Sequence, residues 1–162
     1  MSRTALALIT ILFIPALVVG QTKAEESLPI REACLISSHG ITPIRVELAI
    51  TESERRKGLM GRTSLAPNTG MLFIYEEPRE PERGFWMHRT LIPLDIAYLD
   101  NQGTIKAIKQ MFPCKSTLES GCPVYRAGVS FSGALEMNQF FFRNNGISVG
   151  DRVSTSESIC KH

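Results

Sequence analysis

The sequence lacks the short motifs that identify the common enzyme classes. It has no H-E-x-x-H zinc motif, no glycine-rich phosphate loop and no recognisable serine–histidine–aspartate arrangement. Its four cysteines are never spaced as C-x-x-C, which argues against a cysteine-bound metal. Internal repeats and low-complexity tracts are absent as well. We therefore expect neither a metal nor a cofactor, and the sequence leaves open whether the protein is an enzyme.

No charge of one sign dominates either. The chain has 18 Lys and Arg against 16 Asp and Glu, a formal net charge of +2, and the basic residues are scattered through both halves. A nucleic-acid-binding surface needs a concentrated basic stripe. We therefore predict no nucleic-acid partner.

Long hydrophobic runs are limited to one, at residues 5–19. Arg3 precedes this run, and Thr22-Lys23-Ala24 follows it with the small-x-small pattern of a signal-peptide cleavage site. The run is shorter than the roughly 18 residues that span a bilayer comfortably, although an uncleaved anchor stays open. We predict a signal peptide at 1–24, a periplasmic or secreted location, and no transmembrane segment after cleavage.

The remaining residues, 25–162, have the length of a single domain. This part contains all four cysteines, and an even number in an exported protein predicts disulfides. Three pairings are possible. Cys114 and Cys122 flank a short loop and form the natural local pair, which leaves Cys34 to pair with Cys160. We expect no free thiol.

The hydrophobic pattern predicts many short strands and only two short helices. Thr51 and Glu54 have the spacing of a capping box, so a helix should run to about Met60 and end at Gly61. Asn138 is placed to cap a second helix through Asn144. Strands are expected at residues 33–38, 41–51, 70–75, 85–90, 92–100, 104–112 and 147–156, with one or two more within 124–137, interrupted at Gly133. This pattern predicts an all-β sandwich or barrel.

Six short blocks occur in a fixed order: GLM within 56–60, GMLF at 70–73, WM-x-x-T within 85–90, PLDI within 92–96, LE at 135–136 and GD at 150–151. In this order they resemble the bacterial and archaeal family catalogued as domain of unknown function 192. The resemblance implies a compact β-sandwich or barrel with helical inserts. It implies no activity, so function has to be argued from the residues.

Two carboxylates, Asp95 and Glu136, are the candidate catalytic residues. A carboxylate between apolar strand residues is either a general acid or base with a perturbed pKa, or a buried hydrogen-bonding strut. A convergent pair would suit hydrolysis of a glycosidic bond or binding of a divalent ion. We favour the strut for Asp95 and expect Gly150-Asp151 to form a turn.

The candidate ligand-binding residues are Trp86, Thr90, Asp95 and Arg62. A bend at Pro93 would let Trp86, Thr90 and Asp95 border one concavity, with Trp86 as a stacking platform or a core anchor. Arg62 belongs with a basic helix that also carries Arg55, Arg56 and Lys57. These cations form either a solvated face or a contact with an anionic ligand or the membrane surface.

Methionine and histidine also allow a copper(I) site, formed by Met60, Met71, Met87 and His88. Strand alternation opposes this site, because Met87 and His88 should point to opposite faces. Core packing is the preferred interpretation, with Met71 and Phe73 on a buried face.

Two functional hypotheses follow. The first is an exported binding or accessory module for a small polar ligand or an envelope partner. The second is a cell-envelope hydrolase that uses Asp95 and Glu136. The separation of the two carboxyl groups distinguishes them, because a glycosidase pair lies about 5 to 10 Å apart across an open groove.

Overall fold

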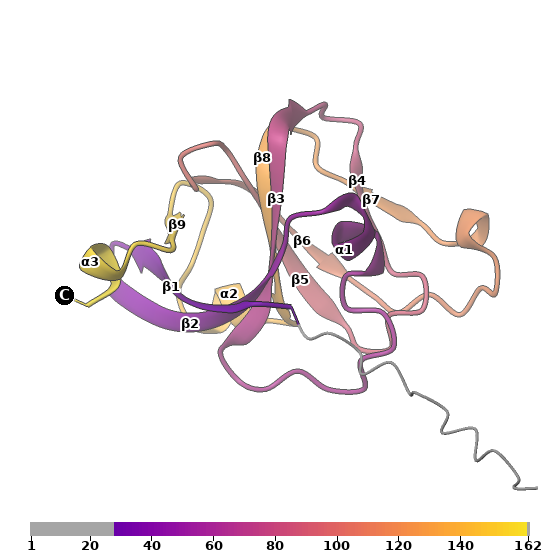
Figure 1. The fold of residues 1–162 in the computed structure, drawn as a ribbon, viewed down its shortest axis with the longest axis horizontal. Helices are drawn as coiled ribbons and strands as arrows, with labels where there is room; N and C mark the ends of the chain where they lie inside the picture. Colours follow the sequence, from indigo (N-terminus) through magenta and orange to yellow (C-terminus); the bar gives the residue numbers. More distant parts are fainter. Residues whose placement is uncertain (1–27, 162) are drawn as a thin grey trace, which may run out of the picture.

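The computed structural model describes residues 28–161, so the predicted signal peptide lies outside the described part. Figure 1 shows a curved sheet with the short helices packed around it. The elements are, in chain order, β1 (Ile30–Ser37), β2 (Gly40–Ala49), α1 (Glu52–Lys57), β3 (Thr69–Arg79), β4 (Gly84–Trp86), β5 (Leu94–Leu99), β6 (Ile105–Met111), η1 (Glu119–Gly121), β7 (Val124–Arg126), β8 (Phe131–Asn138), α2 (Phe141–Asn144), β9 (Arg152–Ser154) and α3 (Glu157–Cys160).

Seven strands form one sheet in the order β6-β5-β8-β3-β2-β1-β9, and β4 pairs with β7 in a small second sheet. The β2–β3 pair is parallel, whereas the other pairs of the large sheet are antiparallel. The two edges of the large sheet meet, because Ile105 donates to the carbonyl of Asp151 and Val153 to that of Gly103. These contacts curl the sheet toward a barrel. The predicted all-β fold is confirmed, with three short α-helices in the described chain rather than two.

The large sheet buries apolar side chains on both faces. The inner face, enclosed by the curled sheet, carries residues such as Leu35, Val46 and Leu135. The outer face carries Met71, Phe73 and further apolar residues of β5 and β8. The outer core is covered by α1 and by the β4–β7 sheet (Figure 1). Phe85 of β4 packs edge-on against Phe73, with ring centroids 4.8 Å apart.

The predicted capping box is present. Glu54 donates its backbone N–H to Thr51, and its carboxylate accepts from the Thr51 backbone N–H at 2.7 Å. The predicted end of the helix was wrong, because α1 ends at Gly58 rather than Gly61. Gly58 has a φ of 47°, a conformation that glycine adopts without steric cost, so the chain turns there three residues earlier than predicted.

Several other predicted boundaries were wrong. The final strand, predicted at 147–156, is confined to Arg152–Ser154, and the break predicted at Gly133 falls before Phe131 instead. The strand predicted at 70–75 continues to Arg79, with a register shift between Ile74 and Arg79 that accommodates a proline. The strand predicted at 85–90 ends at Trp86. Asn138 does not cap α2, because it ends β8 and donates its side-chain amide to the carbonyl of Leu65 at 3.0 Å.

Both predicted disulfides are present. Cys34 of β1 bonds Cys160 of α3, and Cys114 bonds Cys122 across the loop that holds η1. Such bonds persist in oxidising compartments and are consistent with an extracytoplasmic location. Within residues 28–161, no helix has the length and apolar character that a membrane crossing requires.

Candidate functional site

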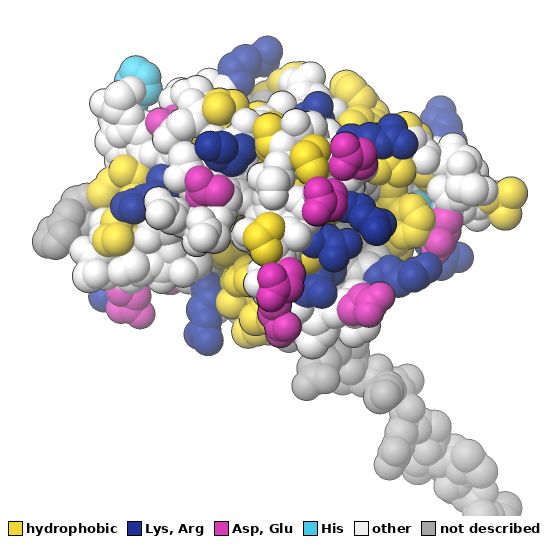
Figure 2. Space-filling view, turned by 90° about the horizontal axis from the view of Figure 1, so that it is seen from above, with side chains coloured by type: hydrophobic (Ala, Val, Ile, Leu, Met, Phe, Trp, Pro, Cys, Tyr) yellow, Lys and Arg dark blue, Asp and Glu magenta, His cyan; other side chains and the backbone are white. Residues whose placement is uncertain are grey.

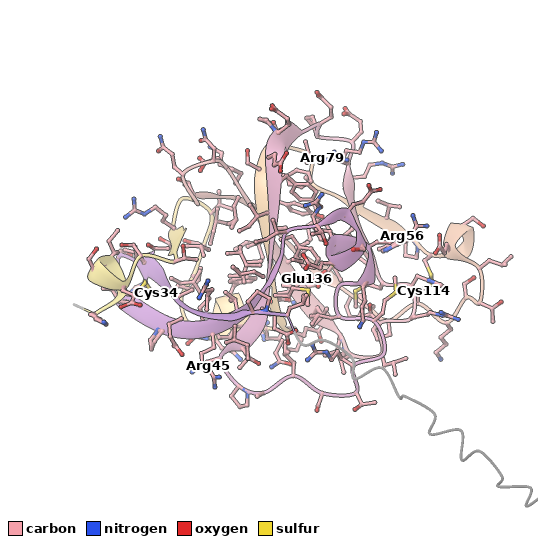
Figure 3. All side chains as sticks on the ribbon, viewed as in Figure 1. Cys34, Arg45, Arg56, Arg79, Cys114 and Glu136 are labelled. Carbon is pink, nitrogen blue, oxygen red and sulfur yellow. A yellow bond between two sulfur atoms is a disulfide. The ribbon has the colours of Figure 1, made fainter. Side chains whose placement is uncertain are left out.

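A small cavity of about 90 Å³ lies between α1, β4 and the outer face of the large sheet. It is called the Glu136 pocket here. It has room for a few water molecules or for one polar group of a ligand. Figure 3 shows Glu136 on the sheet beneath α1, with Arg56 on that helix. The pocket is lined by Arg55, Arg56, Lys57, Gly58, Leu59, Met60, Phe73, Tyr75, Gly84, Phe85, Trp86, Thr90 and Glu136.

Glu136 comes from the middle of β8. It pairs across the sheet with Met71 of β3 on one side and with Ile96 of β5 on the other, so it shares their face. Only 4% of the residue is exposed. Gly70 permits this close strand packing, because a Cβ there would lie 2.3 Å from the carbonyl oxygen of Glu136. The GMLF block therefore positions the β8 backbone from which Glu136 projects.

The environment of Glu136 is apolar. Burial raises the pKa of its carboxyl from 4.5 to about 8, and no neighbouring charge contributes to this shift. No Lys or Arg within residues 28–161 therefore neutralises this carboxyl. Near neutral pH it is largely protonated, and a protonated carboxyl both donates and accepts a hydrogen bond.

The rim of the pocket is basic, because the last turn of α1 carries Arg55, Arg56 and Lys57. Arg55 is held in place by hydrogen bonds to the carbonyls of Ile50 and Ile74, and its guanidinium lies 4.7 Å from the centre of the Tyr75 ring. Arg56 forms an ion pair with a glutamate of η1 at 3.3 Å. Arg55 is thus held at a fixed place, and Arg56 has an acidic partner at the rim.

Trp86 and Thr90 form one wall of the pocket. After Trp86 the chain leaves β4 in a tight turn, in which Thr90 donates its backbone N–H to the carbonyl of Met87 at 3.1 Å. Arg89 adopts a φ of 56° in this turn, a conformation uncommon for a residue other than glycine. The carbonyl of Arg89 accepts from the N–H of Gly61, which ties the wall to the segment after α1.

Asp95 lies on the other face of the sheet. It pairs with Met137, and its side chain points to the inner core beneath α2 with 3% exposure. Burial raises the pKa of Asp95, while the backbone N–H groups of Phe140 and Phe142 lower it in part. Asp95 thus faces the start of α2, but its Oδ1 has no hydrogen-bond partner among the described residues, so the strut interpretation stays a prediction. It does not border the Glu136 pocket, so the predicted concavity of Trp86, Thr90 and Asp95 loses its third member.

Arg62 lies outside the Glu136 pocket as well. Its guanidinium donates to both carboxylate oxygens of Glu47 at 2.7 Å. The pair lines a wider cavity of about 810 Å³ on the other side of the Gly58–Met60 segment. Arg62 is therefore a partner of Glu47.

The methionines and His88 are placed mainly by packing. Met71 and Met87 are fully enclosed in the outer core, and Met60 lines the rim. Alternation is confirmed along this segment: Phe85 and Met87 face the core, while His88 packs against the ring of Trp86, with centroids 5.9 Å apart. Met87 and His88 therefore point away from each other.

The structure brings together two of the four predicted ligand-binding residues, Trp86 and Thr90, and adds one of the two predicted carboxylates, Glu136. Sequence reasoning missed that α1 supplies the rim and that Tyr75 borders the same cavity. The basic helix was noticed, but alternation alone cannot show which sheet face a helix covers.

The fold and this site define a small barrel-like β protein with a buried, basic-rimmed acid pocket. The chain belongs to the family domain of unknown function 192, described as "Uncharacterized ACR", whose pattern matches residues 34–155. Four of the six blocks noted in the sequence supply residues of the Glu136 pocket: Gly58-Leu59-Met60, Phe73, Trp86 with Thr90, and Glu136.

Two crystal structures resemble the chain closely. One, from Sinorhizobium meliloti 1021, is described as a "putative transcription regulator"; it is 32% identical with a TM-score of 0.72, over 80% of this chain and 96% of that one. The other, from Novosphingobium aromaticivorans DSM 12444, is described as a protein of unknown function. It is also 32% identical with a TM-score of 0.69, over 78% of this chain and 86% of that one. No match is found among the curated proteins.

Proposed function

We propose that this protein is an exported binding module that takes a small polar ligand, or one polar group of a larger ligand, into the Glu136 pocket. The observation that carries the proposal is the buried Glu136 carboxyl at a cavity, without a neutralising cation among the described residues. Burying such a group costs stability, which a purely structural role would offset with hydrogen bonds.

The composition of the lining supports the same function. Ligand sites are concave and mostly apolar, with a few polar groups that fix orientation. Here Phe73, Phe85 and Trp86 supply apolar surface, while Glu136 and Thr90 supply hydrogen-bonding groups. The two disulfides support an exported location for the module.

The paired-carboxylate hydrolase gains no support from the geometry. Asp95 and Glu136 leave opposite faces of the sheet, so one substrate cannot contact both. The name of the Sinorhizobium protein is no basis for a nucleic-acid function in this chain. The face in Figure 2 intersperses basic and acidic side chains rather than gathering the basic ones into a stripe.

The test is a screen of small polar compounds by NMR on the ¹⁵N-labelled protein. Trp86 is the only tryptophan, so its indole N–H gives one unambiguous signal at the pocket. A ligand should shift this signal, and Thr90→Val should weaken its binding at least threefold. The matched control is Thr42→Val on β2, which lies away from the pocket and should leave binding unchanged. If no compound shifts the indole signal, or if both variants bind as the wild type does, the proposal is wrong.

A further inference from the structure

We infer that the Glu136 pocket recognises a carboxylate, held between the Glu136 carboxyl at its inner end and the cations of α1 at its rim. This inference rests on the proposed function and specifies its ligand class.

The inner end of the pocket offers a hydrogen-bond donor rather than a charge. Glu136 is buried, and this burial raises the pKa of its carboxyl. No Lys or Arg of residues 28–161 contributes to the shift. A protonated carboxyl can donate to one oxygen of a ligand carboxylate, in a short charge-assisted bond. Ionised, the same group would repel the ligand.

The rim supplies the complementary positive charge. Arg55, Arg56 and Lys57 all line the pocket from the last turn of α1. The hydrogen bonds of Arg55 to two carbonyls and its contact with Tyr75 hold that cation in place without adding an acid to the pocket. An anion entering the cavity is therefore attracted at the rim and meets a neutral acid inside.

The size of the cavity limits what enters. A volume of about 90 Å³ accommodates a carboxylate with its adjoining carbon, whereas a sugar ring would have to remain outside. Trp86 and Phe85 provide the apolar surface against which the adjoining carbon would pack.

Few other titratable groups face Glu136. Tyr98 of β5 and Tyr75 of β3 interact with it electrostatically, and burial raises the pKa of both phenols, so both stay neutral at the pH of the test. Helix α1 presents Arg55, Arg56 and Lys57, with Glu119 of η1 paired to Arg56. His88 lies beside the ring of Trp86 and is not among the residues that line the pocket.

The experiment compares acetate with acetamide and methylammonium, three probes of similar size with charges of −1, 0 and +1. Trp86 fluorescence reports binding at constant ionic strength, at pH 6.5 and pH 9.5, with concentrations to about 100 mM because such small ligands bind weakly. Acetate should bind at least tenfold more tightly than acetamide at pH 6.5. Its affinity should fall about tenfold per pH unit above pH 8 as Glu136 ionises.

Glu136→Gln is the matched variant, because glutamine keeps the shape and a donor but does not ionise. Acetate binding to this variant should lose the pH dependence above pH 8. A dependence that persists there comes from another group and overturns the inference. Methylammonium binding that strengthens with rising pH also overturns the inference. It would indicate a cation site and leave the proposed function intact. If none of these probes binds but the NMR screen finds a ligand at Trp86, only the carboxylate inference fails; if neither does, both fail.

Discussion

Asp95 and Glu136 lie on neighbouring strands but on opposite faces of the same sheet. Glu136 pairs with Ile96, and Asp95 pairs with Met137. The two pairs are neighbours in the antiparallel ladder, one residue apart on each strand. Because side chains alternate along a strand, this single step sends Glu136 to the outer pocket and Asp95 to the inner core. The two carboxyl groups therefore have separate roles, and their replacement should have separate consequences.

Asp95→Asn should destabilise the protein by about 1 to 3 kcal/mol. Its carboxylate is buried beneath the backbone N–H groups of Phe140 and Phe142, and an amide would bring a donor to where only an acceptor fits. Urea denaturation measures the change. Asp100→Asn is the comparison variant. The carboxylate of Asp100 also accepts from backbone N–H groups, but it lies in a hairpin turn outside the core. A stability for Asp95→Asn equal to the wild type would show that Asp95 is not a strut.

Glu136→Gln should change how stability depends on pH. The folded wild type keeps the Glu136 proton up to about pH 8, whereas the unfolded chain releases it near pH 4.5. Unfolding in this interval releases a proton, so rising pH lowers the wild-type free energy of unfolding, by up to about 1.4 kcal/mol per pH unit, with no further loss above pH 8.

The glutamine variant lacks this component. The difference in free energy of unfolding, wild type minus variant, should therefore decrease by a few kcal/mol between pH 5 and pH 8. Denaturation series at four pH values measure it. A difference that does not vary with pH would mean that Glu136 is ionised in the folded protein.

Met71→Ala and Phe73→Ala should each cost roughly 2 to 5 kcal/mol, because both side chains are 1% exposed in the outer core. Ile74→Ala is the internal control, since Ile74 follows Phe73 on the opposite face of β3 and is 38% exposed. It should cost less than about 1 kcal/mol. Equal denaturant midpoints for all three variants would refute this assignment of faces.

The two disulfides should differ in their contribution. Cys34–Cys160 spans 126 residues and Cys114–Cys122 only 8, so loss of the first should cost about 2 kcal/mol more in a chain-entropy estimate. Paired Cys→Ser variants test this by urea denaturation. A larger loss from the local pair would contradict the chain-entropy estimate.

Intact mass of the exported protein should show a start near Glu25 and no alkylation before reduction.

The sequence by itself determined features that depend on neighbours along the chain. The capping box at Thr51 needs only its side chain and that of Glu54, and the turn at Asp100 needs only local backbone groups. The buried face with Met71 and Phe73 followed from alternation, and the cysteine pairing followed from spacing.

Only the tertiary structure decided which residues form the candidate site. Alternation indicates which residues share a face of one strand, but the register between β5 and β8 sets whether Asp95 or Glu136 meets Trp86. The position of α1 over the outer face is likewise a matter of packing, and it places Arg55 and Arg56 above Glu136. These contacts join residues up to 81 positions apart, so no local pattern in the sequence specifies them.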